Sequence, residues 1–198
     1  MTLDRLRPVA DRGLVPFVRF ARRLGLTPDG VSVIAFAVAI GAAAAFVAGG
    51  AWYLLGAALV FANGWLDLLD GALARELEVD SPAGDLLDHV LDRYADVVII
   101  AGLAAGVGRY GLGFAAVTGV LLTSYLGTQA QAVGAGRDYG GLLGRADRLA
   151  LVGVAAALAP FTGRLGPLGA VGWLLAVFAV VGHLTAIQRF RGAWRDLR

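Results

Sequence analysis

The sequence contains no cysteine and no lysine among its 198 residues. The absence of cysteine excludes a disulfide, a thiolate metal site and a cysteine nucleophile. Because lysine is also absent, all 17 basic residues are arginine, and we infer no function from that choice. Charged residues of both signs are few, at 16% of the chain. Any chemistry must therefore come from a small number of oxygen and nitrogen groups.

The scarcity of charge accompanies an excess of apolar residues. Hydrophobic residues make up 58% of the chain, and the mean hydropathy is +0.72. These values exclude a soluble domain of this size and predict an integral membrane protein. A helix of about 20 apolar residues crosses the roughly 30 Å of hydrocarbon in a bilayer. Six apolar runs predict membrane spans at about 30–50, 52–75, 85–107, 111–135, 147–163 and 166–190, the fifth being the shortest.

We therefore expect an all-α integral membrane protein with six transmembrane helices, preceded by an amphipathic surface helix. No repeat of fixed period and no linker divides the chain, which predicts a single domain over residues 1–198. Residues 1–26 would form a juxtamembrane segment and residues 27–198 the six-helix bundle. Nothing at the start resembles a cleavable signal peptide, so we expect the first span to be retained.

The juxtamembrane segment alternates Arg with Leu, Val and Phe at helical spacing. This pattern predicts an amphipathic helix along the membrane surface, broken near Pro8 and Pro16. The alternative is a solvated basic leader that only sets the topology. The turn Thr27-Pro28-Asp29 predicts the start of the first span, with Asp29 able to cap it.

Arginine is distributed unevenly. Six arginines precede residue 24 and four follow Gln188, whereas the loops on the opposite side of the predicted bundle hold only Arg109 and Arg164. By the positive-inside rule, both termini lie in the cytoplasm. We therefore expect a multi-pass protein of the cell membrane whose surroundings are the lipid bilayer, with no nucleic-acid partner.

Acidic residues gather in one region, because nine of the 15 lie between Asp67 and Asp96. Asp67 and Asp70 are three residues apart at the end of the second span, so they share one helix face. Asp88 and Asp92 are four residues apart on the third span and also share a face. A short turn brings these helices back antiparallel, so the two carboxylate pairs can meet at the cytoplasmic boundary of the membrane.

Four carboxylates at membrane depth call for a compensating cation, because an ionised carboxylate there is costly. Oxygen ligands without histidine or cysteine suit a hard ion such as Mg²⁺ or Mn²⁺. Four carboxylates could hold two ions roughly 3.5–4 Å apart. The alternative is that these aspartates pair with Arg75 and Arg93 and cap helix ends, but two bases would leave charge unpaired in a low-dielectric setting.

Residues 67 to 92 match the pattern D-x-x-D-G-x-x-A-R-(8 residues)-G-x-x-x-D-x-x-x-D. This pattern resembles the signature of the CDP-alcohol phosphotransferase family at every position. The six-span layout, the surface helix and the turn at Thr27-Pro28 extend the resemblance over essentially the whole chain. The resemblance implies a metal-dependent enzyme that moves a phosphatidyl group from a CDP-linked lipid to an alcohol and releases CMP. It also implies a homodimer.

The resemblance assigns roles to the carboxylates. It implies that Asp67, Asp70 and Asp88 are metal ligands for Mg²⁺ or Mn²⁺. Asp92 would complete the metal site and act as general base on the acceptor hydroxyl.

The other residues of the pattern would contact the nucleotide. Gly71, Ala74 and Gly84 would leave room for the cytidine, since a larger side chain would occupy its space. Arg75 would face the nucleotide or its phosphates. These residues do not indicate which lipid tails the donor carries, so CDP-diacylglycerol and CDP-archaeol are both open as donors. The general resemblance of the stretch from Q-A-Q-A to G-R-A-D-R favours an archaeal ether-lipid enzyme, whose donor is CDP-archaeol.

Arginines near the cytoplasmic boundary could bind the acceptor. Arginine forks bind phosphate bidentately, which favours an acceptor that already carries a phosphate. The candidates are Arg137, Arg145, Arg148 and Arg189. The segment G-R-A-D-R resembles the arginine pair of the family branch whose acceptor is inositol phosphate, which implies this role for Arg145 and Arg148. The preceding Q-A-Q-A departs from that branch, so glycerol phosphate is the nearest competitor, and these arginines could instead only set topology.

Two readings without catalysis compete with the enzyme. A transporter or channel would carry broken helices near the middle of the membrane, or acids deep in several spans. Here the acids cluster at one surface instead. An inactive scaffold is the second alternative, and the intact Asp92 argues against it.

Overall fold

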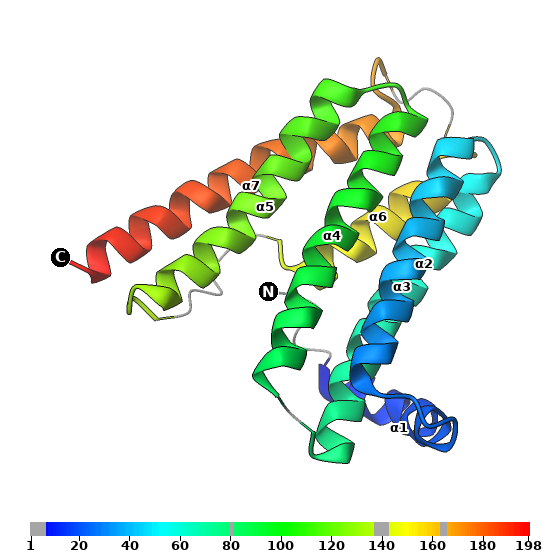
Figure 1. Ribbon diagram of the computed structural model, residues 1–198. Helices are drawn as coiled ribbons and strands as arrows, with labels where there is room; N and C mark the ends of the chain where they lie inside the picture. The colour runs from blue at the N-terminus through cyan, green and yellow to red at the C-terminus, as the bar shows by residue number, and fades with distance from the viewer. Residues whose placement is uncertain (1–6, 80, 137–142, 163–165) are drawn as a thin grey trace.

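The computed structural model describes residues 7–79, 81–136, 143–162 and 166–198, and the regular structure within these ranges is entirely helical. Figure 1 shows the helices as one bundle with a separate helix across one end. The helices are α1 (Arg7–Arg23), α2 (Pro28–Ala48), α3 (Trp52–Leu77), α4 (Pro82–Gly106), α5 (Tyr110–Ala132), α6 (Arg145–Leu158) and α7 (Gly169–Asp196). The expected all-α class is confirmed.

Two helices begin with the same local device. At α2, the Thr27 hydroxyl accepts a hydrogen bond from the Gly30 N–H at 3.1 Å, and a proline follows the cap directly. At α4, the Ser81 hydroxyl accepts from the Gly84 N–H at 3.0 Å, and again a proline follows. Proline suits the first helical turn because its missing N–H would have no helical partner there. The expectation that Asp29 caps the first span is wrong, because the Thr27 side chain does so.

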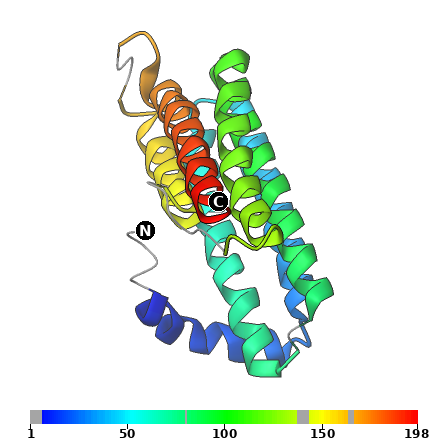
Figure 2. The ribbon, with the colours of Figure 1, turned by 90° about the vertical axis from the view of Figure 1, so that its left-hand side faces the viewer.

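The surface helix α1 lies across the end of the bundle, beside the last turns of α3 (Figure 2). Leu14 and Val18 are buried against Leu69 and Leu73 of α3. Helix α1 runs unbroken from Arg7 to Arg23 with Pro16 inside it, so the expected break near Pro8 and Pro16 is wrong. Pro16 lies on the exposed side of α1. The opposite side packs on α3, and this packing keeps the helix continuous despite the hydrogen bond that proline cannot donate.

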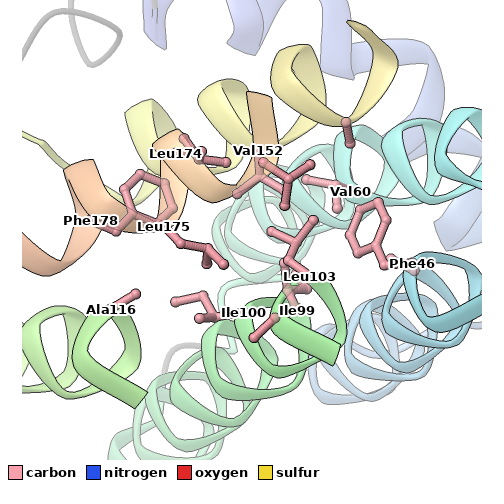
Figure 3. Packing of buried hydrophobic residues seen from close by; sticks show 14 of the residues in the cluster. Phe46, Val60, Ile99, Ile100, Leu103, Ala116, Val152, Leu174, Leu175 and Phe178 are labelled. Atoms are coloured by element: carbon pink, nitrogen blue, oxygen red, sulfur yellow. The ribbon is translucent and has the colours of Figure 1, made fainter. Parts of the chain in front are cut away.

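The remaining helices pack around one apolar core. Helix α2 packs on α3 and α4, α5 packs along α7, and α6 lies between α3 and α7. Figure 3 shows how side chains from these helices meet at the centre. The most buried of the labelled residues include Phe46, Val60, Leu103, Leu175 and Phe178, all below 2% exposed. This core fixes α3, α4 and α6 relative to one another, and these helices carry the site.

Four of the described helices are long and apolar enough to cross a membrane: α2, α3, α5 and α7. Their apolar windows are only 33–44% buried within the bundle, as lipid-facing helices require. Helix α6 has 14 residues and ends at Leu158, earlier than the predicted end of the fifth span at 163. At 1.5 Å per residue it is about 21 Å long, which is less than the hydrocarbon thickness. The structure supports a multi-pass membrane protein.

Small residues allow the helices to approach closely. A Cβ added at Gly102 of α4 would lie 2.6 Å from the Cα of Ala43 on α2. A Cβ at Gly182 of α7 would lie 2.7 Å from the backbone carbonyl carbon of Gly119 on α5. In lipid, such close packing replaces the hydrophobic driving force that holds soluble helices together.

We predict that Gly102→Ala destabilises the protein, because the new methyl group meets backbone atoms that cannot move aside separately. Overpacking of this kind costs about 1–3 kcal/mol. Thermal unfolding in detergent checks it, with Gly111→Ala as control, because a Cβ at Gly111 would meet nothing within 4 Å. Equal melting temperatures for Gly102→Ala and the unmutated protein would contradict the close α2–α4 contact.

Candidate active site

Three carboxylates meet where α3 ends and α4 begins. One oxygen each from Asp67, Asp70 and Asp88 lies within 4.8 Å of the others. Helical spacing places the first two on one face of α3, and the turn after α3 returns the chain so that α4 presents Asp88 to them. Glu78, the residue after α3, has φ 53° in the left-handed region and so ends the helix at this point. These three residues are hereafter the acidic triad.

Asp70 is the most firmly held member of the acidic triad. It is buried, and its Oδ2 accepts a hydrogen bond from the Ser32 hydroxyl at 2.7 Å. Its Oδ1 accepts from the Gly71 N–H at 2.6 Å. Ser32 lies on α2 and was not expected from the sequence, although a lone hydroxyl one turn after the helix start in an apolar run was a possible signal.

Asp92 lines the same small cavity as the acidic triad and shares the Arg145 guanidinium with Asp67. Arg145, at the start of α6, forms an ion pair with Asp67 of α3 and another with Asp92 of α4, the latter at 2.7 Å. The Arg145 side chain is 15% exposed, so both ion pairs are shielded from water. Arg145 therefore ties α3, α4 and α6 together at the site.

Within the described part of the chain, neither Asp70 nor Asp88 has a basic side chain at ion-pair distance. The alternative that Arg75 and Arg93 neutralise the acids therefore accounts for Asp92 alone, which Arg93 contacts at 3.5 Å, and it leaves Asp70 and Asp88 without a cation. The acidic triad offers only oxygen donors, which suit a hard divalent cation.

A buried amide adds to the fit. The Asn63 Nδ2 donates to the Ala35 carbonyl at 2.9 Å, whereas its Oδ1 is buried without a hydrogen-bond partner. Asn63 lines a small internal cavity together with the acidic triad and Asp92. An unsatisfied buried oxygen beside three carboxylates favours a cation over an empty space. The residues present thus fit Mg²⁺ or Mn²⁺.

A cavity of about 410 Å³ opens on one side of the acidic triad, between the start of α2, the end of α3 and the start of α4. It is lined by Pro28, Asp29, Ser32, Asp70, Gly71, Ala74, Val79, Ser81, Pro82, Gly84, Asp85 and Asp88. We call it the donor cavity. It includes all three small residues of the sequence pattern, and a Cβ at Gly84 would lie 3.1 Å from the Asp29 Oδ1. Any side chain there would narrow the cavity.

Arg75 lies elsewhere. It lines a separate groove of about 420 Å³ between α1 and α3, together with Arg19 and Glu76. Its Nη1 approaches to 3.5 Å from the position of a Cβ on Gly71. Arg75 is thus not among the residues that line the donor cavity, although its guanidinium lies next to Gly71, and its role toward the nucleotide stays a prediction.

A second and larger cavity of about 700 Å³ lies among α4, α5, α6 and α7 and is lined in part by Arg145. Its lining residues are His89, Val90, Asp92, Arg93, Tyr94, Leu121, Thr123, Ser124, Tyr125, Gly127, Thr128, Leu143, Gly144, Arg145, Arg148 and Arg189. We call it the acceptor cavity. It brings together three of the four arginines expected at a phosphate site, and Arg137 lies outside the described residues.

The arginines of the acceptor cavity are held by neighbouring helices. Arg148 donates to the Asp96 carboxylate at 3.0 Å, and Arg189 donates to the Thr123 carbonyl at 2.6 Å; both arginines are buried. Arg93 hydrogen bonds to the Ser124 hydroxyl. Sequence reasoning missed Arg93 as a cavity residue, because its position follows from the packing of α4 on α5. Four fixed guanidinium groups around one cavity suit a phosphorylated ligand.

The fold and these two cavities define a multi-pass membrane protein with an oxygen-ligand cation site between them. The model of the family named CDP-alcohol phosphatidyltransferase matches residues 25–184. The chain belongs to the CDP-alcohol phosphatidyltransferase family, and it is an enzyme of phospholipid synthesis. The family expected from the sequence pattern is thereby confirmed.

The relatives include synthases whose names give an inositol phosphate lipid as the product. The archaetidylinositol phosphate synthase of Methanothermobacter thermautotrophicus is 34% identical over 99% of this chain and 96% of its own length. The phosphatidylinositol phosphate synthase of Mycolicibacterium smegmatis is 36% identical over 89% of this chain and 82% of its own. Among solved structures, the Mycobacterium tuberculosis phosphatidylinositol phosphate synthase with CDP-DAG bound matches with a TM-score of 0.80 and 28% identity, covering 92% of this chain and 94% of that one.

The same mycobacterial enzyme has also been solved in complex with manganese and citrate, again with a TM-score of 0.80. The match covers 91% of this chain and 88% of the mycobacterial chain. The likeness extends across the helices that carry both cavities.

We predict that Asp88→Asn weakens Mn²⁺ binding about 10-fold or more, because it removes one of three charged oxygen ligands. Electron paramagnetic resonance of free Mn²⁺ titrated with purified protein measures this. Glu76→Gln is the matched control, because Glu76 lies on α3 outside the donor cavity and its side chain is 52% exposed. If both variants bind Mn²⁺ as the unmutated protein does, the acidic triad is not the metal site.

Proposed function

We propose that this enzyme transfers a phosphatidyl or archaetidyl group from a CDP-lipid to inositol phosphate and releases CMP. The observation that carries the proposal is the arginine-lined acceptor cavity, which shares Arg145 and Asp92 with the acidic site. A phosphorylated acceptor held there would lie beside the carboxylates at which the donor is expected. The names of the relatives support inositol phosphate as that acceptor.

The proposed membrane arrangement is the six-span bundle expected from the sequence. Helices α4 and α6 would supply the two spans beyond the four that qualify by length and composition. We propose one domain over residues 1–198, with both termini and the site on the cytoplasmic side. The arginine-rich α1 lies at the same end of the bundle as the acidic triad, which supports this orientation (Figure 2). A homodimer, expected from the family likeness, is part of the proposal.

The donor would bind across the acidic triad and the donor cavity. Gly71, Ala74 and Gly84 leave space in that cavity for the cytidine. Asp67, Asp70, Asp88 and Asp92 would hold one or two Mg²⁺ or Mn²⁺ ions. When bound, such ions neutralise the pyrophosphate and stabilise charge on the departing oxygen. Ser32 and the Gly71 N–H keep the Asp70 carboxylate in a fixed orientation for this purpose.

The acceptor would bind with its phosphate on Arg145, Arg148 and Arg189. Its hydroxyl would then lie near Asp92, which lines the acceptor cavity. Asp92 would take the proton as the hydroxyl oxygen attacks the lipid-bearing phosphorus. The bond from that phosphorus to the bridging oxygen breaks, and CMP leaves with the electron pair. Holding both substrates in line supplies much of the rate enhancement.

Glycerol phosphate is the competing acceptor, because its phosphate would satisfy the same arginines. An unphosphorylated acceptor such as serine would make no use of the four guanidinium groups of the acceptor cavity as a phosphate site. Family membership and the intact acidic pattern favour an enzyme over the transporter and scaffold readings.

Release of CMP by purified protein tests the proposal. With Mn²⁺ and either CDP-diacylglycerol or CDP-archaeol, we expect inositol phosphate to stimulate CMP release well above glycerol phosphate and serine. Chelation by EDTA should abolish the release, because the acidic triad then lacks its cation. Preferential stimulation by glycerol phosphate would contradict the acceptor, and release that resists EDTA would contradict the metal dependence.

We further predict that Asp92→Asn lowers kcat by about 100-fold or more, the usual contribution of a general base. Gel filtration and Mn²⁺ binding should show that the variant is folded and still binds metal through the acidic triad. The amide keeps the size of the side chain but cannot accept the proton. If turnover is retained, Asp92 is not the base.

A further inference from the structure

We propose that Asp96 is the positioning residue that aligns the arginines of the acceptor cavity. The inference rests on the proposed function, because it concerns how the phosphorylated acceptor is held. Asp96 lies on α4, one helical turn beyond Asp92, and outside the eight-position sequence pattern. Its side chain is only 4% exposed. Burial of a carboxylate at this depth needs a compensating partner.

Asp96 has three such partners, from two helices. Its Oδ2 lies 3.0 Å from the Arg148 Nη2 and 4.0 Å from the Arg93 Nη2. Its Oδ1 lies 4.0 Å from the Arg145 Nε. All three arginines line the acceptor cavity, so one buried carboxylate faces three of its four guanidinium groups.

Asp96 does not itself line the acceptor cavity as far as the described residues define it. It therefore acts on an acceptor only through the arginines. Arg148 uses one Nη for Asp96 at hydrogen-bond distance, and a guanidinium has five N–H donors in a rigid fork, so donors are left for a ligand. Fixing one edge of the fork fixes the direction of the others, and bidentate phosphate recognition depends on that direction.

The competing interpretation is a structural ion pair that only balances charge. In that case, any anion at about the same place would balance the charge of the arginines. The affinity for the acceptor would then not depend on the exact position of the carboxylate. Charge balance alone also predicts that Asp96→Asn changes the affinity for the phosphate in the opposite direction. Removal of the carboxylate makes the cavity more positive and would strengthen phosphate binding. The two interpretations therefore differ in the direction of the expected change.

The test compares Asp96→Asn with the unmutated enzyme. We expect the KM for inositol phosphate to rise about 10-fold, the effect of losing oriented charged hydrogen bonds. The KM for the CDP-lipid, the Mn²⁺ affinity and kcat should each change less than the KM for inositol phosphate, because Asp96 belongs neither to the acidic triad nor to the lining of the donor cavity. Calorimetric binding of inositol phosphate without CDP-lipid should show the same loss of affinity.

Asp96→Glu provides the second variant, which keeps the buried charge but moves the carboxylate by one methylene. Positioning predicts a KM for inositol phosphate between those of Asp96→Asn and the unmutated enzyme, whereas charge balance predicts no change. This variant decides the question if Asp96→Asn does not fold. Unchanged or tighter inositol phosphate binding in the folded variants would overturn the proposal.

The binding measurement also separates this proposal from the proposed function. If no acceptor stimulates CMP release but inositol phosphate binds and Asp96→Asn weakens that binding, the transferase assignment fails and the positioning role stands. If CMP release proceeds and both Asp96 variants keep the unmutated affinity, the positioning role fails alone.

Discussion

The ion pairs of Arg145 with Asp67 and Asp92 are the interaction on which the site depends. Carboxylates at the membrane boundary are unfavourable without a cation, and α3 and α4 bring four of them to one place. Arg145 neutralises part of this charge and joins three helices that are otherwise held by the apolar core. The same guanidinium lines both the acceptor cavity and the small cavity of the acidic triad. The same ion pairs therefore compensate the buried charge and hold the helices of the site together.

This arrangement explains why the two cavities differ in chemistry. The donor cavity lies beside the acidic triad and is lined by small residues, so it suits a nucleotide whose phosphates are carried by divalent cations. The acceptor cavity has four arginines and suits a phosphate without a metal. In the proposed function, each negatively charged substrate would thus meet a different kind of cation. Asp92 lines the acceptor cavity and contacts Arg145, at the point where the two substrates would meet.

The sequence predicted what depends on local spacing. Asp67, Asp70 and Asp88 come together because helical periodicity fixes their faces and a short turn returns the chain. Residues that reach the site through helix packing were not predictable in the same way. Ser32 reaches Asp70 from a helix 38 residues earlier in the chain, and Arg93 takes its place in the acceptor cavity through the contact of α4 with α5.

The differences in the fold have equally local causes. The cap of α2 is a hydroxyl before the proline, where a carboxylate after it had been expected, and α1 stays helical through Pro16 because α3 supports its buried side.

The central claim is that metal and acceptor phosphate occupy adjoining halves of one site. Phosphorus-31 relaxation of inositol phosphate, measured with Mn²⁺-loaded protein, tests it most directly. The account predicts strong relaxation by bound Mn²⁺ that is lost in Asp88→Asn at equal total Mn²⁺. Inositol phosphate that binds without enhanced relaxation would place the two sites apart and contradict the account.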